Sequence, residues 1–145
     1  MKLVSIIAAA LFWCNGCAIK KHRESNILPM EITAQFSISP KTKLFLSHLN
    51  IELKASGKLI SEFIPSDELT DKYMISKTNG MFYISGVLSV QQNFDFDTLN
   101  SVGVIYGFTV INTVPVHIPL TGLHNFFKLP NITYFEISKP LNSFK

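Results

Sequence analysis

The order in which strand and helix patterns follow one another between residues 79 and 139 limits this chain to few folds. Four segments rich in β-branched, aromatic and aliphatic residues are predicted as strands, and two segments with one apolar side are predicted as helices. The strands are residues 81–90, 104–108, 111–118 and 132–138, and the helices are residues 93–101 and 119–129. The resulting order, βαββαβ, predicts an α+β domain with a ferredoxin-like antiparallel sheet.

The two helices of this unit are expected on one face of the sheet, because crossover connections are right-handed. A further helix is predicted ahead of the unit. Ser39 can cap its first turn, Pro40 suits its first position, and Gly57 can close it after Ala55. Its apolar side is formed by Phe45, Leu46, Leu49 and Leu53. We expect this N-terminal helix to cover part of the opposite face of the sheet.

Residues 39–78 thus contain the N-terminal helix and a connection to the βαββαβ unit. In the connection, Ser66 can cap a single helical turn, and residues 73–75 have the composition of a short strand. Asn79-Gly80 predicts a tight turn into the strand that follows. A hairpin is therefore expected at this turn.

The chain begins with the layout of a secretory signal peptide over residues 1–16. Lys2 is followed by an apolar run over residues 3–13, and small and polar residues then lead to Cys17. The apolar run is shorter than the roughly 20 residues that a membrane-spanning helix needs. We therefore expect export of the chain and removal of this segment.

Cys17 is the predicted site of lipid attachment. Lipoprotein signal peptides place a small residue before the cysteine that receives the lipid, and Gly16-Cys17 resembles this feature, although Cys14 and Asn15 stand where a leucine and a small residue are typical. The alternative is an ordinary secretory signal and a secreted product. Because Ala18 stands in place of the aspartate that often retains lipoproteins at the inner membrane, the resemblance implies a bacterial cell-envelope protein at the outer membrane rather than the inner one.

Residues 17–38 are predicted as a tether between the lipid and the domain, since they are weakly periodic and contain Pro29. About 120 residues remain after removal of the signal, which suits a single domain. Both cysteines of the chain lie in or beside the signal, so the domain has neither an internal disulfide nor a cysteine zinc site. The net charge of +3 includes Lys2, and no long basic block follows, which gives no support to nucleic-acid binding.

The sequence contains no catalytic signature: Gly-x-Ser-x-Gly, His-Glu-x-x-His, a glycine-rich phosphate loop and a calcium loop are all missing. Asp95 and Asp97 are interpreted as helix-capping residues rather than as a catalytic pair. The four histidines are interpreted as solvated or hydrogen-bonded side chains in the tether, the first helix, a strand and a helix, in the order His22, His48, His117 and His124. We expect no enzyme activity, no cofactor, no metal and no small-molecule substrate.

Four segments together resemble the N-terminal prodomain of secreted subtilisin-like serine proteases, namely residues 83–88, 96–104, 114–120 and 127–138. The strongest pieces are Leu-x-x-x-Gly-Val from Leu99, Ile-Pro-Leu from Ile118 and Leu-Pro-x-Ile-x-Tyr-x-Glu from Leu129. Within the last piece, Asn131 stands where many relatives have glycine, and asparagine tolerates the left-handed conformation best after glycine. The resemblance covers residues 79–139, and a weaker one extends back through residues 39–55 and 62–69.

The resemblance implies a specific role. In the family, the prodomain lays its sheet against the protease, and the extended segment after the last strand runs into the active-site cleft like a substrate. It templates folding of the protease and inhibits the enzyme until it is removed. In this chain that segment comprises Lys139, which closes the prodomain-like unit, and the C-terminal tail of residues 140–145, namely Pro140, Leu141, Asn142, Ser143, Phe144 and Lys145.

No catalytic half follows this tail in the sequence, so the resemblance implies a separate binding module that inhibits or chaperones a subtilisin-like serine protease. Two alternatives stay open. The chain can be a structural or interaction lipoprotein that keeps the fold without inhibitory activity, or it can be a fragment of a longer protease.

Overall fold

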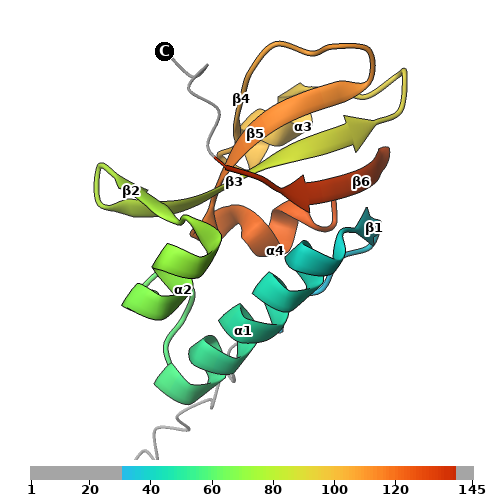
Figure 1. Ribbon diagram of the computed structural model, residues 1–145. Coiled ribbons are helices and arrows are strands. Elements are labelled where there is room, and N and C mark those ends of the chain that lie inside the picture. Colours follow the sequence, from blue (N-terminus) through green and yellow to red (C-terminus); the bar gives the residue numbers. More distant parts are fainter. Residues whose placement is uncertain (1–30, 140–145) are drawn as a thin grey trace, which may run out of the picture.

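The computed structural model describes residues 31–139 of the chain, and Figure 1 shows their arrangement. The predictions for residues 1–30 and 140–145, among them the signal peptide, the lipid on Cys17 and most of the tail, fall outside the described residues. The elements in chain order are β1 (Ser37–Ile38), α1 (Pro40–Ser56), α2 (Asp67–Tyr73), β2 (Ser76–Thr78), β3 (Met81–Val90), α3 (Asp97–Ser101), β4 (Ile105–Tyr106), β5 (Thr113–Pro119), the 3₁₀ turn η1 (Leu120–Gly122), α4 (Leu123–Phe126) and β6 (Ile132–Ile137).

The described strands form one six-stranded sheet in the order β1-β6-β3-β5-β4, with β2 paired to β3 outside this path. β1 and β6 run parallel, and the other pairs are antiparallel. The fold is therefore mixed α and β, as predicted, but the expected four antiparallel strands are extended by two. β1 adds a strand beside β6, and β2 forms the predicted hairpin with β3, in which Asn79 and Gly80 both have positive φ angles of 50° and 81°.

The sheet has one face packed on the helices, because successive strand residues point to opposite faces. The side chains on the packed face are nearly or fully buried and belong to one hydrophobic cluster with the helices. From β3 they are Ile84 and Leu88, from β5 Val114, Val116 and Ile118, and from β6 Phe135 and Ile137.

Gly86 occupies the packed face of β3 between Ile84 and Leu88, and the close approach of Phe135 explains the glycine. A Cβ at this position would overlap the Phe135 ring and lie 2.5 Å from the carbonyl oxygen of Glu136. The aromatic ring thus fills the space that a side chain on β3 would take. β3 and β6 can pair at this point only because one of the two strands has no side chain there.

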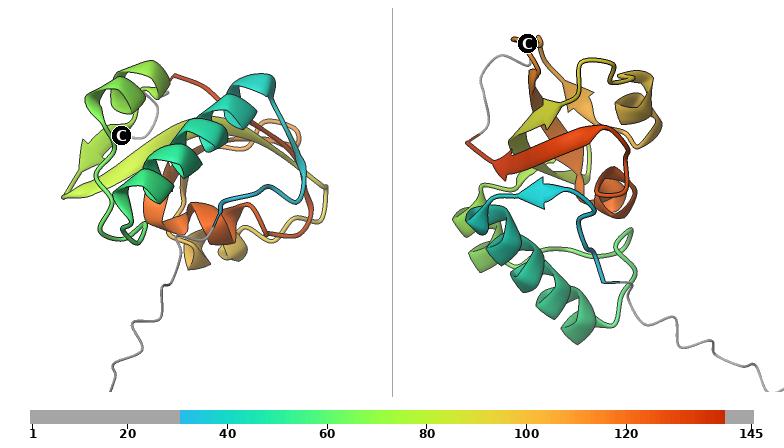
Figure 2. Two further views of the ribbon diagram at one scale, coloured as in Figure 1. Left: turned by 90° about the horizontal axis from the view of Figure 1, so that it is seen from below. Right: turned by 90° about the vertical axis from the view of Figure 1, so that its right-hand side faces the viewer.

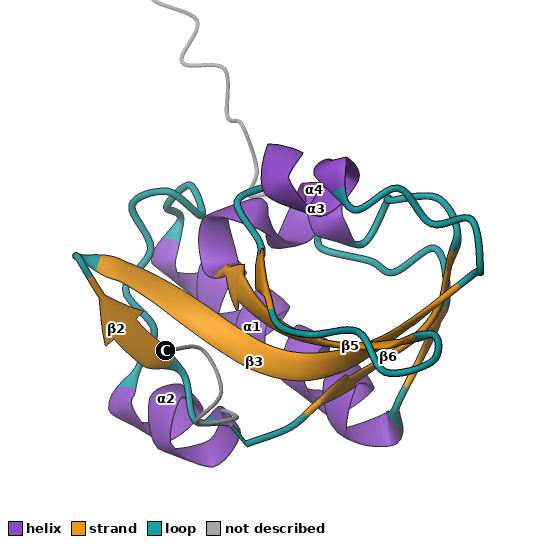
Figure 3. Cartoon of the chain, turned by 90° about the horizontal axis from the view of Figure 1, so that it is seen from above, coloured by secondary structure: helices purple, strands orange, loops and turns teal. Residues whose placement is uncertain are grey.

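The N-terminal helix begins and ends as predicted. The hydroxyl of Ser39 accepts a hydrogen bond from the backbone N–H of Thr42 at 3.1 Å, and Gly57 ends α1 with a φ of 64°. The buried side of α1 belongs to the same hydrophobic cluster as the packed face of the sheet. The left view of Figure 2, from below, shows α1 in front of β3, and Figure 3, from above, shows α1 behind β3.

The prediction that this helix covers the opposite face of the sheet is therefore wrong. The chain enters α1 directly from β1, which lies at the edge of the sheet next to β6. There the hydroxyl of Thr42 accepts a hydrogen bond from the backbone N–H of Ile137 at 3.1 Å, which fixes the first turn of α1 to this edge. The helix then runs along the packed face of the sheet and covers the hydrophobic core on that side.

The predicted strand at residues 73–75 does not form. α2 continues to Tyr73, and Met74 ends it in the left-handed conformation with a φ of 54°. The buried side chain of Tyr73 contacts Phe45 of α1 with ring centroids 5.1 Å apart. The helix predicted as a single turn at Ser66 is therefore longer, and it packs on α1 through Tyr73. The strand begins only at Ser76, as β2.

The helix predicted at residues 119–129 is shorter. Pro119 is the last residue of β5, and η1 and α4 together end at Phe126. Two other short elements also have narrower limits than predicted, namely α3 in place of residues 93–101 and β4 in place of residues 104–108. β5 begins two residues later and ends one residue later than the predicted strand at residues 111–118. The ends of elements this short depend on tertiary contacts more than on local propensity.

Residues 31–38, predicted as the end of the tether, pack into the fold instead. Ile32 is buried, and Phe36 contacts Phe126 and Phe127 with ring centroids 5.9 and 5.7 Å apart. Exposed positions alternate with buried or half-buried ones along this segment up to β1, which pairs with β6. Such alternation is typical of an extended segment with one apolar side, formed here by Ile32, Ala34, Phe36 and Ile38.

Candidate partner-binding face of the sheet

The face of the sheet turned away from the helices is the candidate functional site, and it is called the open face below. None of the described helices lies on it (Figure 3). Strand register places its residues in rows, with Ser85 opposite His117, and Val87 between Pro115 and Glu136. The residues of the open face are Tyr83, Ser85, Val87 and Ser89 of β3, Pro115 and His117 of β5, Tyr134 and Glu136 of β6, and Ile105 of β4.

His117 is held at one end of this face by neighbours on three sides. Its ring stacks on Tyr83 with centroids 4.5 Å apart and planes within 4°. Its Nδ1 atom lies 2.9 Å from the hydroxyl of Ser85, and its Nε2 atom lies 3.4 Å from the hydroxyl of Ser76 on β2. Burial lowers the pKa of His117, because removal from water disfavours the charged imidazolium.

The serine and histidine of this cluster are within hydrogen-bond distance, as in a nucleophile and its base, but the exposure of Ser85 indicates another use. Ser85 is only 2 % exposed, so a substrate cannot reach its hydroxyl without rearrangement of the sheet. The hydroxyl therefore orients the imidazole. Tyr83 is also buried, at 6 % exposed, so of these three side chains only that of His117, which is partly exposed, contributes to the surface at this end of the open face.

The other predicted polar residues lie elsewhere and are not brought together. The Nδ1 atom of His48 lies 2.9 Å from the hydroxyl of Tyr73 between α1 and α2, and burial raises the pKa of that tyrosine. The Nε2 atom of His124 lies 2.6 Å from Nζ of Lys128. These contacts bear out the interpretation of both histidines as hydrogen-bonded side chains.

The prediction that Asp95 or Asp97 caps α3 is wrong, because the N-cap position of this helix is Phe96 and none of the described side chains caps it. Asp95 instead forms a local turn just ahead of α3. Its carboxylate accepts a hydrogen bond from the backbone N–H of Asp97 at 3.0 Å, and its carbonyl oxygen accepts from the hydroxyl of Thr98 at 2.6 Å. Within residues 31–139 no group of three histidine, cysteine, aspartate or glutamate side chains is placed to hold a metal ion.

The tail, the predicted partner-binding segment, begins just after the last described hydrogen bond between β6 and β3. The backbone N–H of Ser138 donates to the carbonyl oxygen of Ser85 at 3.1 Å. Two residues further along the same edge of β3, Tyr83 is already paired with Ser76 of β2. Because β2 occupies that edge, β6 cannot extend further along β3. Lys139, the last described residue, is exposed.

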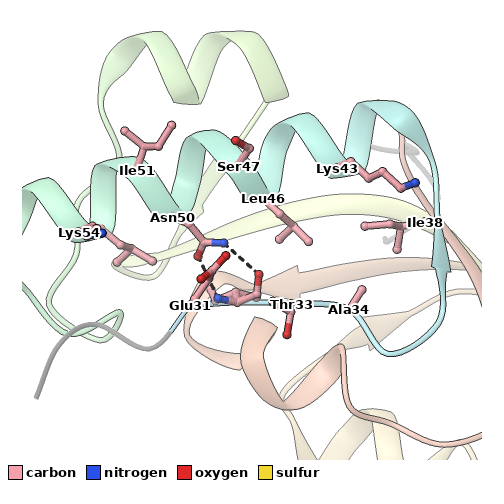
Figure 4. A pocket seen from close by; sticks show the side chains of 12 residues that line it. Glu31, Thr33, Ala34, Ile38, Lys43, Leu46, Ser47, Asn50, Ile51 and Lys54 are labelled. Atoms are coloured by element: carbon pink, nitrogen blue, oxygen red, sulfur yellow. Dashed lines mark hydrogen bonds between the residues drawn. The ribbon is translucent and has the colours of Figure 1, made fainter.

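A groove of about 590 Å³ lies on a different part of the molecule, between α1 and residues 31–34 (Figure 4). Asn50 points from α1 into it and bonds both backbone groups of Ile32, accepting from its N–H at 2.9 Å and donating to its carbonyl at 3.0 Å. The two charged side chains of α1 that line the groove are both lysines, Lys43 and Lys54. The groove carries no convergent set of acid, base and nucleophile, and the Asn50 contacts give it a structural role.

Among residues 31–139, no helix is both long enough and apolar enough to cross a membrane. Comparison of the chain with family models, with curated protein sequences and with solved structures finds no match.

Proposed function

We propose that this protein is a binding module that docks the open face of its sheet on a subtilisin-like serine protease and inhibits or chaperones that enzyme. The observation that carries the proposal is the position of Lys139. One face of the sheet is packed on helices and the other face is clear of them. The chain must leave β3 after Ser138, because β2 is paired with the next part of that edge. The proposal also rests on the resemblance of residues 79–139 to the prodomains of such proteases.

The unit from β3 to β6 is proposed to be ferredoxin-like. Its four strands stand in the order β6-β3-β5-β4, with α3 between β3 and β4 and with η1 and α4 between β5 and β6. Under this interpretation β1 and β2 are additions to the same sheet. β2 also has a role in the proposal, because its pairing with Tyr83 occupies the edge of β3 along which β6 would otherwise continue.

Inhibition is proposed to come from residues 139–145. An extended segment that enters the cleft of a protease pairs its backbone with the enzyme as a substrate does. The open face supplies the rest of the contact. A stable interface covers about 800 Å² on each partner, more than a seven-residue tail offers by itself, so the tail and the sheet are expected to act together.

The lipid on Cys17 is proposed to hold the module at the bacterial outer membrane. A protein that is exported by a removable signal peptide and anchored by a lipid needs no membrane-spanning helix in its domain. The partner protease is then expected in the same compartment of the cell envelope, and the N-terminal lipid keeps the inhibitor close to it.

The proposal is tested with a chain that starts at residue 17 and carries Cys17→Ala, assayed against several subtilisin-type proteases. Val87 lies at the centre of the open face, and Val87→Arg places a charge there. We expect slow, tight inhibition by the unaltered domain and loss of it in Val87→Arg. Leu44→Arg is the matched control, since Leu44 is an exposed apolar residue of α1 on the helical side.

Chymotrypsin-type serine proteases, which have a different fold, serve as the specificity control and should not be inhibited. Absence of inhibition by the unaltered domain across the whole panel would contradict the proposal. Equal inhibition by Val87→Arg and the unaltered domain would show that the open face takes no part in inhibition.

A further inference from the structure

Figure 1 shows the hairpin that connects β4 to β5. Several large apolar side chains of this hairpin are exposed to solvent. Phe108 is 91 % exposed and Ile111 is 89 % exposed, and Ile105 and Val110 beside them are also exposed. Large apolar side chains normally lose contact with water on folding, and a single exposed one is common. Four within seven residues form a patch of the kind that marks a binding surface.

The conformation of Ile111 is a second, independent sign. Ile111 and Asn112 form a two-residue turn closed by hydrogen bonds between Val110 and Thr113, at 2.9 Å from the N–H of Val110 and 3.0 Å from the N–H of Thr113. Ile111 has a φ of 49°, in the left-handed region that glycine and asparagine tolerate and β-branched residues avoid. An isoleucine here is unfavourable both for the backbone and for solvation, and strain of this type gathers at functional positions.

The patch continues the open face. Ile105 stands opposite His117, in the row of Ser85 and Ser138 where the tail begins, and the N–H of Gly107 donates to the carbonyl oxygen of Pro115 at 2.9 Å, which keeps the hairpin in line with β5. Ser89 pairs with Thr113 and Tyr134, so the tip of the hairpin, with Phe108 and Ile111, lies at the end of the open face where β6 begins. Lys139 leaves from the opposite end, beyond Ser138.

The charge distribution selects the partner. Residues 98–127 contain no Asp, Glu, Lys or Arg, so the patch and the strands next to it have no cation for phosphates or anionic lipids. A bilayer would contact only the tip of the hairpin, whereas the surface of a protein can lie along the tip and the open face together. The occupant is therefore a protein with an apolar depression on its surface.

We infer that Phe108 and Ile111 are anchor residues that insert into an apolar depression on the partner protein, at the far end of the interface from the tail. This inference rests on the proposed function and takes the same protease as the partner. The two ends then have separate tasks. The tail blocks the active site, and the hairpin adds affinity and selects among proteases by a surface remote from the active site.

The test uses the chain from residue 17 with Cys17→Ala and a subtilisin-type protease that it inhibits. Phe108→Ser and Ile111→Gly are each expected to raise the inhibition constant at least about tenfold, as expected for central apolar anchors. Leu44→Ser is the matched control and should leave it unchanged, because Leu44 is 56 % exposed on α1. Ile111→Gly should also keep or raise the melting temperature, since glycine suits the φ of this position.

That combination separates binding from folding, because a residue with a merely structural role would lower the melting temperature when it is replaced. Inhibition by the unaltered domain together with unchanged constants in both variants would overturn the inference and leave the proposed function standing. Failure of the unaltered domain to inhibit any protease would overturn both. Binding to neutral phosphatidylcholine vesicles that Phe108→Ser abolishes, with inhibition unchanged, would assign the hairpin to a membrane instead.

Discussion

The ring of His117 lies flat on the ring of Tyr83, with centroids 4.5 Å apart, and its Nδ1 atom is 2.9 Å from the hydroxyl of Ser85. The imidazole is thereby part of the surface of the sheet rather than a side chain free in water. Its protonation would put a charge among aromatic and hydroxyl groups on the open face.

The first prediction concerns the pH dependence of folding. Burial lowers the pKa of His117 in the folded chain, so the unfolded chain binds more protons below the ordinary histidine pKa of about 6.5. The contribution of His117 to stability is therefore fully present above that pH and is lost as the pH falls towards the lower folded pKa. Urea unfolding at pH 7.5 and pH 5 should show this loss, and His117→Gln should show a smaller one. An equal loss in both proteins would contradict the assignment.

The second prediction concerns the contact of β3 with β6. Gly86→Ala should lower the free energy of unfolding by about 3 kcal/mol, because the new methyl group overlaps the Phe135 ring and meets the backbone of β6. Ser89→Ala, on the same strand but on the open face, should change it by less than about 0.5 kcal/mol. Chemical denaturation followed by circular dichroism measures both. Similar values for the two variants would show that β6 does not approach β3 at Gly86.

The third prediction concerns the start of α1. Thr42→Val keeps the shape of the side chain but removes the oxygen that accepts from the backbone N–H of Ile137. The buried N–H is left without this partner, which should cost about 2 kcal/mol. Hydrogen exchange at the amide of Ile137 should become faster in Thr42→Val and stay slow in Thr42→Ser, which keeps the hydroxyl. Fast exchange at Ile137 in the unaltered protein would rule out the contact.

The fourth prediction concerns residues 31–34. Asn50→Ala removes both hydrogen bonds to the backbone of Ile32 and should lower stability by about 1–2 kcal/mol. The segment should also become more accessible, so limited proteolysis should cut it before the rest of the domain. Ser47→Ala, one turn earlier on α1, is the control and should behave as the unaltered protein does. Resistance of Asn50→Ala to proteolysis in this segment would contradict the assigned role.

The longest elements could be predicted from the sequence because local signals and tertiary contacts agree in them. β3 has the predicted limits, and α1 has the predicted caps at Ser39 and Gly57. β1 could not be predicted in this way, since its two residues form a strand only through pairing with β6. The expected strand at residues 73–75 is absent because Met74 ends α2 in the left-handed conformation, and a methionine side chain gives no signal of such a helix end.

The candidate site was harder to predict than the fold. Ser85 and His117 are brought together by the register of β3 with β5, which a single sequence does not reveal. A polar residue within the apolar run of β3 was the available signal. The exposure of the hairpin could not be predicted either. Phe108 and Ile111 are residue types typical of a buried strand, and only the fold shows that they face solvent.

Truncation of the tail shows whether the open face and the tail act together on a subtilisin-like protease. The inhibition constant is measured for the chain from residue 17 with Cys17→Ala and for the same chain ending at Lys139. We expect the longer chain to inhibit, and loss of residues 140–145 to weaken inhibition at least about tenfold. The melting temperature should stay the same, because these residues follow the last described hydrogen bond between β6 and β3, at Ser138. Equal inhibition by both chains, or inhibition by neither, would contradict the joint action of tail and open face.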